Sequence, residues 1–449
     1  MKKFLRISAW VLLAPLALAV LLYAAGAAVN WRDQPPSAAA ERMRSVFETR
    51  AAVPDANNAY FYILGFHSAP GVDPFSAGKK VADWIDEVNR DPEKFESPPP
   101  LPDYAFDSGY SESMRQLRLS CPGRGPDRDC REAFINAGAE GLSETGLLLL
   151  SRYRELLKHP QLREQVPLDL RVPLPAYSQI LNAQRFFHVD LLRRVNTLGA
   201  AGVREQLHDD LEFWRRVQMS SDILITKMIA VAALRNHFHF GNLVLRALPV
   251  REQAAGIPEG WRRELSPDEL SMLRVMAGEL RFAEHVLWQM DAGVESPMDR
   301  LTHIFSRPYY QQQDTLNERA GDYLFLVERF AVPIARMEAV TRELKSQRSE
   351  SSWSVYNFMG RTLNEISGME SFVNYPMRVA TLEGMRRAAL LTAELRARGL
   401  AAEAVPGALA TSEVRSPFDE ATFEWSIEEG AVVYHGRERH DQNRHLYYF

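Results

Sequence analysis

The sequence predicts a mainly α-helical protein with an N-terminal transmembrane helix, a body of stacked helical hairpins forming a bundle or short solenoid, and a small C-terminal α+β hairpin module. Three observations predict this class: an uncharged apolar stretch behind a basic N-terminus, several long segments with helical periodicity, and a short alternating pattern near the C-terminus. The 449 residues are 46% apolar with a net charge of -5. This composition excludes a disordered chain and gives no electrostatic support for nucleic-acid binding.

The N-terminal segment has the features of a signal anchor. Lys2, Lys3 and Arg6 lie in residues 1–6, and residues 7–29 are uncharged. As a helix, this stretch is about 35 Å long, enough to cross a hydrocarbon core of about 30 Å. The preceding positive charge predicts that residues 1–6 stay in the cytoplasm and that the rest is exported. We therefore expect a single-pass protein of the bacterial inner membrane, with most of the chain in the periplasm.

A cleavable signal peptide is the alternative interpretation. Ala25, Gly26 and Ala27 form an A-x-A pattern, and cleavage before Ala28 would give a soluble periplasmic protein. The uncharged stretch is longer than the roughly 7–15 residues usual for the apolar part of a signal peptide. This length favours the uncleaved anchor.

The two cysteines predict a disulfide. Cys121 and Cys130 bracket the sequence PGRGPDRD, which is rich in glycine, proline and charge and allows the two sulfur atoms to meet. In an oxidising compartment such a pair is expected to be joined. The alternatives are two unrelated thiols or a metal site, and a metal site requires more cysteine or histidine nearby.

Residues 30–131 are predicted to be a linker and a loop-rich region. Ser37 is placed to cap a short helix. Residues 57–66 combine aromatic and β-favouring residues between Pro54 and Pro70, which favours a buried strand or an extended aromatic segment. The prolines in residues 96–109 favour a surface loop.

Residues 132–370 are predicted to form the helical body. Successive segments carry apolar residues at i, i+3, i+4 and i+7, and Ser143 is a possible cap. The periodicity breaks at Pro160, Gly199, Pro249, Gly293 and Pro308. Helices joined by short turns at these positions indicate stacked hairpins. No repeat consensus is strict enough to identify a tetratricopeptide or similar array.

Residues 371–449 are predicted to form the C-terminal module. An amphipathic helix over residues 378–400 precedes the alternating segments TFEWSI and AVVYHG, which flank the turn-forming EEG. This pattern predicts a β-hairpin that a helix must cover. We expect the hairpin to be docked through Phe418, Phe423, Trp425 and Val433.

The segments SPFDEATFEW and GAVVYHG resemble the C-terminal part of pseudopilin-like and other exported bacterial proteins, where a D-P-[FY]-x-G-x-P-[FL]-x-[WY] stretch precedes a hairpin. Ser416 stands in place of the aspartate, and Glu420 and Ala421 replace the turn glycine and its neighbour. The resemblance covers about seventy residues and implies a compact terminal module. For the whole chain it suggests a membrane-anchored proteobacterial family.

The sequence contains none of the common catalytic signatures. It has no G-x-S-x-G, H-E-x-x-H, Walker A or G-x-G-x-x-G motif, so we predict no catalytic residue and no cofactor. The S-x-x-K pattern at Ser76 and Lys79 fits the start of a helix better than a catalytic pair. His237 and His239 would point about 200° apart on a helix, so we predict no metal site there.

Two places are candidates for ligand binding. Lys227 interrupts an otherwise apolar segment, and it either pairs with Asp222 or Glu212 or lines a pocket for an anionic ligand.

The second candidate lies in the segment WSVYNFMGRTLNEI. It offers Asn357, Arg361 and Asn364, which form either a ligand site or a helix-capping and packing motif. Capping and packing is the better-supported interpretation.

These features favour a non-enzymatic, membrane-anchored periplasmic protein whose helical body binds or scaffolds an envelope protein partner. One alternative is an envelope enzyme of unfamiliar type, with a pocket at Lys227 or Arg361. Another is an accessory component of a secretion system, although the anchor lacks the Gly-Phe-x-x-x-Glu processing motif of pilin-like subunits.

Overall fold

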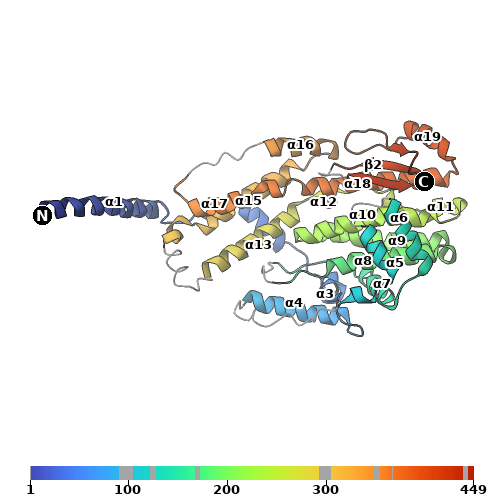
Figure 1. Cartoon of the computed structure of the whole chain (residues 1–449), viewed down its shortest axis with the longest axis horizontal. Helices are drawn as coiled ribbons and strands as arrows, with labels where there is room; N and C mark the ends of the chain where they lie inside the picture. Colours follow the sequence, from blue (N-terminus) through green and yellow to red (C-terminus); the bar gives the residue numbers. More distant parts are fainter. Residues whose placement is uncertain are drawn as a thin grey trace.

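The computed structural model describes residues 2–90, 105–121, 128–166, 172–292, 305–346, 354–366, 368–437 and 443–449, with side chains except in residues 2–12, 107, 128 and 290–292. The described chain is mainly helical and ends in a small antiparallel sheet, as the sequence predicts. Figure 1 shows an elongated body with α1 (Lys2–Val29) projecting from one end and the sheet at the other.

Helix α1 covers the segment predicted to cross a membrane and ends at Val29, the predicted boundary. Its leucines project into solvent: Leu16 is 61% exposed and Leu21 is 67% exposed. Within the part of the chain whose side chains are described, no helix is both long and apolar enough to span a membrane. The membrane-spanning role of α1 therefore stays a prediction.

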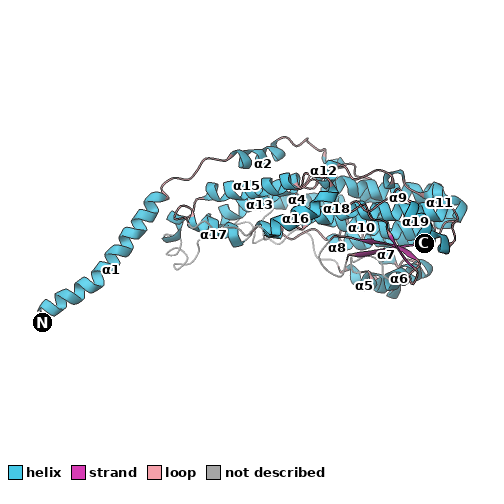
Figure 2. Cartoon of the chain, turned by 90° about the horizontal axis from the view of Figure 1, so that it is seen from above, coloured by secondary structure: helices cyan, strands magenta, loops and turns pink. Residues whose placement is uncertain are grey.

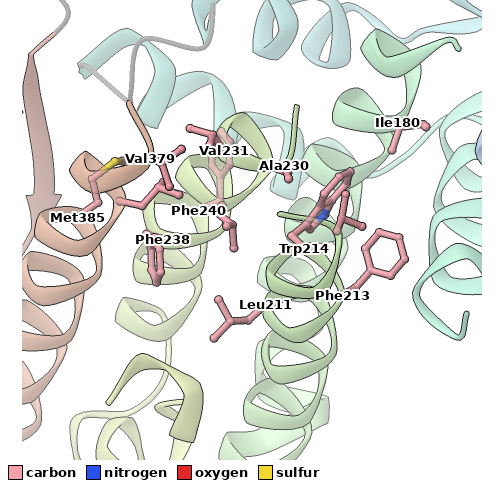
Figure 3. Close-up of a cluster of buried hydrophobic side chains, with 14 of the residues drawn as sticks. Ile180, Leu211, Phe213, Trp214, Ala230, Val231, Phe238, Phe240, Val379 and Met385 are labelled. Atoms are coloured by element: carbon pink, nitrogen blue, oxygen red, sulfur yellow. The ribbon is translucent and has the colours of Figure 1, made fainter. Parts of the chain in front are cut away.

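Helix α10 (Leu224–Arg246) is the centre of the body. It packs against α8 (Tyr177–Arg193), α9 (Val195–Ser220), α18 (Tyr375–Ala397) and the C-terminal sheet. Figure 3 shows Trp214 and Leu211 of α9 beside Phe238 and Phe240 of α10, with Met385 of α18 on the far side. Because α10 is covered on several sides, its sequence is apolar around most of its circumference.

The other helices surround this centre. On one side lie α5 (Glu112–Ser120), α6 (Arg128–Glu140) and α7 (Glu144–Leu157), and at the far end lie α11 (Val250–Gly256) and α19 (Val405–Thr411). The 3-10 turn η4 (Glu259–Trp261) and α12 (Pro267–Leu270) pack against α9 and α18. Toward α1 the body continues as α2 (Ala38–Glu48), α13 (Leu273–Ala292), the turn η5 (Arg307–Tyr309), α15 (Gln312–Arg329), α16 (Ile334–Ser346) and α17 (Phe358–Ile366).

The prediction of a strand or extended segment at residues 57–66 is wrong. The region forms α3 (Ala59–Gly65), with the Asn58 side chain accepting the Tyr60 N–H as a cap, and α3 packs on α4 (Pro74–Arg90). The two helices touch through glycines, since a Cβ on Gly65 would lie 1.9 Å from the Pro74 carbonyl oxygen. In a helix that is buried on most sides, apolar residues occur at nearly every position and show no helical period. A short aromatic run of this kind cannot be distinguished from a buried strand by its sequence.

The predicted disulfide is confirmed. Cys121 directly follows α5, Cys130 lies in the first turn of α6, and the two sulfur atoms are bonded. Both cysteines are buried, so the bond ties two neighbouring helices at the edge of the core. The intervening residues 122–127 lie outside the described part of the chain.

The predicted hairpin is part of a three-stranded sheet. Strands β1 (Glu424–Ser426), β2 (Ala431–His435) and β3 (Arg444–Tyr448) are antiparallel in the order β1-β2-β3, with Trp425 opposite Val432 and Val432 opposite Tyr447. The tail of the chain thus supplies a strand that the sequence pattern did not predict. Of the side chains expected to dock the sheet, Phe418, Phe423 and Val433 are buried, whereas Trp425 is only partly buried at the edge.

Residues 371–449 are continuous with the body and do not form a separate module. Helix α18 packs on both α10 and α11, and the sheet lies across α10 and α18. The closest approach is at Gly384 of α18, where an added Cβ would lie 2.1 Å from the Tyr434 ring of β2. The absence of a side chain at Gly384 therefore sets the distance between helix and sheet.

We expect Gly384→Ala to lower the free energy of unfolding by about 1–3 kcal/mol, because the new methyl group overpacks the interface with Tyr434. The matched control is Gly321→Ala in α15, where an added Cβ meets nothing within 4 Å. This control should gain about 0.5–1 kcal/mol from helix propensity. Denaturant melts of the full chain in detergent measure both, and equal midpoints for the two variants would contradict the packing argument.

Candidate functional site

Asn357, a predicted ligand-binding residue, lies at the junction between α1 and the body. It is fully buried and has a positive φ of 51°. Its backbone N–H donates to Asn30 Oδ1 at 2.7 Å, its Oδ1 accepts the Gln311 N–H at 2.8 Å, and its Nδ2 donates to Asp314 Oδ2 at 2.9 Å. Asparagine is among the few non-glycine residues that adopt this backbone conformation readily. The side chain is therefore used to join chain segments.

Asn30 completes the junction from the α1 side. Its Nδ2 donates to the carbonyl oxygens of Gly26 and Val355, each at 2.9 Å, and its own carbonyl accepts Gln311 Nε2 at 2.6 Å. The end of α1 is thus hydrogen-bonded to the start of α15 and to the segment before α17. A buried, satisfied amide network of this kind fixes one relative position of the elements it joins.

Asp33 adds a helix cap to the junction. Its carboxylate accepts the N–H groups of Gln313 and Asp314, at 2.7 and 3.0 Å, in the first turn of α15. An acidic group is favourable at this position, because the first N–H groups of a helix lack partners within the helix and carry partial positive charge.

Arg361 and Asn364 lie on the face of α17 that packs against α15. Arg361 Nε pairs with Glu318 Oε1 at 3.0 Å. Asn364 Oδ1 accepts from Arg319 Nη2 at 2.9 Å, and its Nδ2 donates to the Thr315 carbonyl at 3.0 Å. The structure therefore brings Asn357, Arg361 and Asn364 to one helix interface.

Lys227 lies far from this junction, in the middle of the body. The side chain is buried, and Nζ donates to the carbonyl oxygens of Gln218 at 2.8 Å and Glu269 at 3.1 Å. Gln218 lies near the C-terminal end of α9, where carbonyl groups lack partners and favour a cation. Burial lowers the pKa of Lys227 to about 7.

The expected partners of Lys227 are engaged elsewhere. Glu212 pairs with Arg263 at 2.9 Å, and Asp222 pairs with Arg50 and with Arg274, the latter at 3.0 Å. The prediction of a carboxylate partner is therefore wrong, since backbone carbonyls do not show in a sequence pattern. Lys227 joins α10 to the ends of α9 and α12.

A polar cluster that the sequence analysis did not predict surrounds Asp210, which is fully buried. The Asp210 carboxylate accepts from His237 Nδ1 at 2.7 Å, from the Tyr153 hydroxyl, and from Gln184 Nε2 at 3.2 Å. His188 Nε2 lies 3.5 Å from the same carboxylate. The only signal in the sequence is an acidic residue on the apolar face of α9, between Leu207 and Trp214.

Two tryptophans extend this cluster. Trp261 Nε1 donates to His237 Nε2 at 2.7 Å, and Trp214 Nε1 donates to the Tyr153 hydroxyl at 2.6 Å. A neutral imidazole that accepts at Nε2 carries its proton on Nδ1. The hydrogen bond from Trp261 therefore selects the His237 tautomer that is protonated on Nδ1, and His237 donates this proton to Asp210.

The charge state of the cluster follows from these contacts. Burial acts to raise the pKa of Asp210, but hydrogen bonds from His237 and Tyr153 and the neighbouring imidazoles outweigh it and hold this pKa below its usual value. Burial lowers the pKa of His188 to about 4, even though the Asp210 charge opposes this shift. At neutral pH the cluster thus holds an ionised carboxylate among neutral donors.

His188, Asp210 and His237 place one potential metal-ligand atom each within 4.8 Å of one another. A metal bound through His237 Nδ1 would need the proton on Nε2, where Trp261 already donates. The described contacts therefore fit a hydrogen-bond network better than a metal centre. His239 lies on another side of α10, stacked on Tyr447 at 5.0 Å, so the prediction that His237 and His239 point apart is confirmed.

His239 belongs to a second buried histidine pair, between α10 and the sheet. Its ring lies 5.6 Å from that of His445, and both histidines are fully buried near Arg235. Burial and the Arg235 charge lower the pKa of His239 to about 3, and burial beside His239 takes that of His445 well below its usual value. Both side chains are therefore neutral when the sheet is docked.

Comparison of the sequence with protein-family models and curated proteins, and of the fold with solved structures, finds no match. The proposed function is therefore based on the sequence and on the contacts of the described residues. They assign Asn357, Arg361, Asn364 and Lys227 to joints between helices.

We expect Asn357→Asp to destabilise the protein by about 2–3 kcal/mol at neutral pH, because a second buried carboxylate would face Asp314 in place of an amide donor. Adding Asp314→Asn should restore much of the loss by returning a donor to that contact. Denaturant midpoints of the two variants, of Asp314→Asn alone and of the wild type complete the cycle. Additive effects would show that the two side chains do not interact.

The buried histidines predict acid sensitivity. The pKa values of His188, His239 and His445 are lower in the folded state than in the unfolded chain, where the histidine pKa is about 6.5. Their contribution to stability is therefore complete above about pH 6.5 and is lost as the pH falls from about 6.5 toward the pKa values of the folded state. Each contributes a slope of about 1.4 kcal/mol per pH unit over its window.

Removing one of these histidines tests the slope. We expect His239→Phe to make the pH dependence of unfolding shallower by about 1.4 kcal/mol per unit between pH 6 and pH 4. The exposed His208, changed to Gln, controls for the loss of a surface histidine. Parallel curves for His239→Phe and the wild type would contradict the assignment of a neutral buried His239.

Proposed function

We propose that this chain is a membrane-anchored protein of the bacterial envelope, in which α1 crosses the inner membrane and the helical body works in the periplasm as a binding or scaffolding element for an envelope protein. The observation that carries the proposal is the projection of α1 away from the body with its leucines exposed (Figure 2). Burying a leucine side chain is worth about 1.5–3 kcal/mol, so a lipid environment would stabilise this helix strongly.

Two further features support export. Lys2, Lys3 and Arg6 precede the apolar segment, which favours a cytoplasmic N-terminus. The bond between Cys121 and Cys130 suits an oxidising compartment such as the periplasm.

The contacts of the polar residues support a scaffold more than an enzyme. Lys227, Asn357, Arg361 and Asn364 each bond to other parts of the body, and the Asp210 cluster is fully buried. A rigid body on a fixed anchor would present its surface to a partner in one orientation.

We expect alkaline carbonate washes to leave the wild-type chain in the membrane fraction and protease to reach its body in spheroplasts. The double variant Leu16→Arg with Leu21→Arg should be released, since each arginine near the middle of a membrane helix costs about 2.5–3.5 kcal/mol. The control is Leu147→Arg with Ile427→Arg, two exposed apolar residues of the body.

The outcomes separate the alternatives. An intact mass lacking the first 27 residues would show cleavage before Ala28 and a soluble periplasmic protein. Extraction of the uncleaved wild-type chain by carbonate would overturn the anchor. Protection of the body from protease in spheroplasts, with lysis restoring digestion, would overturn the periplasmic location.

A further inference from the structure

Helix α17 has its apolar side facing outward. Phe358, Met359 and Ile366 are 44%, 37% and 79% exposed, while Arg361 and Asn364 face α15. A surface helix of a soluble protein normally has the reverse arrangement, with its apolar stripe toward the core. The inversion indicates that the outer side of α17 is made for an apolar environment.

The exposed residues share one face of the helix. At about 100° per residue, positions 358, 359 and 366 fall within an arc of about 100°, and positions 361 and 364 lie outside this arc. The polar face is engaged in the body, where Arg361 pairs with Glu318. The apolar residues Phe358, Met359 and Ile366 are presented outward, together with the exposed Glu365.

More exposed apolar side chains lie where α1 leaves the body. Trp31, which directly follows the junction residue Asn30, is 81% exposed. Phe305 is 56% exposed and contacts the Tyr23 ring of α1 edge to face at 5.9 Å. Val355, 37% exposed, accepts the Asn30 side chain through its carbonyl.

We name this surface the collar and define it by Trp31, Phe305, Val355, Phe358, Met359 and Ile366. Figure 2 shows α1 running obliquely to the long axis of the body, with α17 on the side toward which α1 descends. A membrane crossed by α1 would therefore approach this side of the body.

We infer that the collar rests in the interfacial layer of the same lipid bilayer that α1 enters. The inference rests on the proposed function, because α1 brings the bilayer to this end of the body. Proximity to α1 selects lipid as the occupant, since Phe305 of the collar contacts the Tyr23 ring of α1 and Val355 accepts a hydrogen bond from Asn30 at the end of α1. Tryptophan and phenylalanine beside an outward apolar helix face are typical of interfacial contacts.

The collar changes how the body is held. The Asn30–Asn357 hydrogen bond fixes the end of α1 to the body, and a second contact through α17 fixes the tilt of the body on the membrane. The body would then present one side to the periplasm and would not rotate freely on its anchor. A partner would meet a surface of defined height and orientation.

The test uses the full chain with single introduced cysteines, labelled without reductant so that the native disulfide stays closed. Ile366→Cys reports the collar, and Ile427→Cys, an isoleucine of similar exposure in the turn between β1 and β2, is the matched control. Leu18→Cys in α1 reports the anchor itself. Each labelled protein is placed in vesicles of phosphatidylethanolamine and phosphatidylglycerol that carry a doxyl-labelled lipid, with the doxyl group near the headgroup for Ile366 and Ile427 and near the end of the acyl chain for Leu18.

We expect the label at Ile366 to lose about half of its emission to the quencher lipid, as for a side chain at the headgroup boundary, while the label at Ile427 is unaffected. Quenching at Leu18 without quenching at Ile366 would overturn the collar contact and keep the anchor. Absence of quenching at all three sites would overturn the anchor. An Ile366 label shielded in detergent but not quenched by the lipid would show a protein partner on the collar instead of a bilayer.

Discussion

The buried carboxylate of Asp210 needs hydrogen-bond donors, and this need constrains how the helices of the body pack. A carboxylate without partners in a protein interior costs several kcal/mol, so the helices must deliver donors to it. They come from separate elements: Tyr153 from α7, Gln184 from α8 and His237 from α10. Trp261 of η4 in turn fixes the tautomer of His237. A shift of any of these elements along its neighbour would leave an unpaired charge. The network therefore selects one register among several that apolar packing alone would allow.

The same kind of constraint operates at the other end of the molecule, with amides in place of a charge. Gln311 donates hydrogen bonds to both Asn30 and Asn357, and Asn357 donates to Asn30, so that the end of α1, the start of α15 and the segment before α17 meet at one point. The positive φ of Asn357 is tolerated because three elements hold it. From this point α15 continues along α13 and α2 into the body. The direction of α1 is therefore linked to the core through packed helices and amide hydrogen bonds, without a flexible stalk.

Much of the fold follows from local sequence. Ser37 and Ser143 cap α2 and α7 as predicted, and the disulfide and the β1–β2 hairpin are confirmed. Glu420 has a φ of 55°, a backbone conformation that the sequence pattern does not indicate for a glutamate. Local patterns fail where contacts are distant. The run at residues 57–66 has no visible period because α3 is covered on most sides, and the donors to Asp210 are spread from Tyr153 to His237. Of the candidate ligand residues, Lys227, Arg361 and Asn364 lie on helices and Asn357 directly precedes α17. Their partners were not predictable, because most are backbone groups or side chains of other elements.

The distribution of polar and apolar groups distinguishes the two ends of the molecule. The interior accommodates buried ion pairs such as Arg215 with Glu269 and Arg386 with Glu383, each supported by further hydrogen bonds. Single exposed apolar residues such as Ile427 are ordinary on a protein surface. The exposed apolar side chains of α17 differ because three of them share one face of the helix, while Arg361 and Asn364 are directed toward α15. If this face of α17 met water, polar residues such as Asn364 and Arg361 would be expected on it, with the apolar residues facing the core. That the chain instead directs these groups toward α15 and exposes Phe358 and Ile366 beside the exit of α1 supports the inferred contact of this end of the body with lipid.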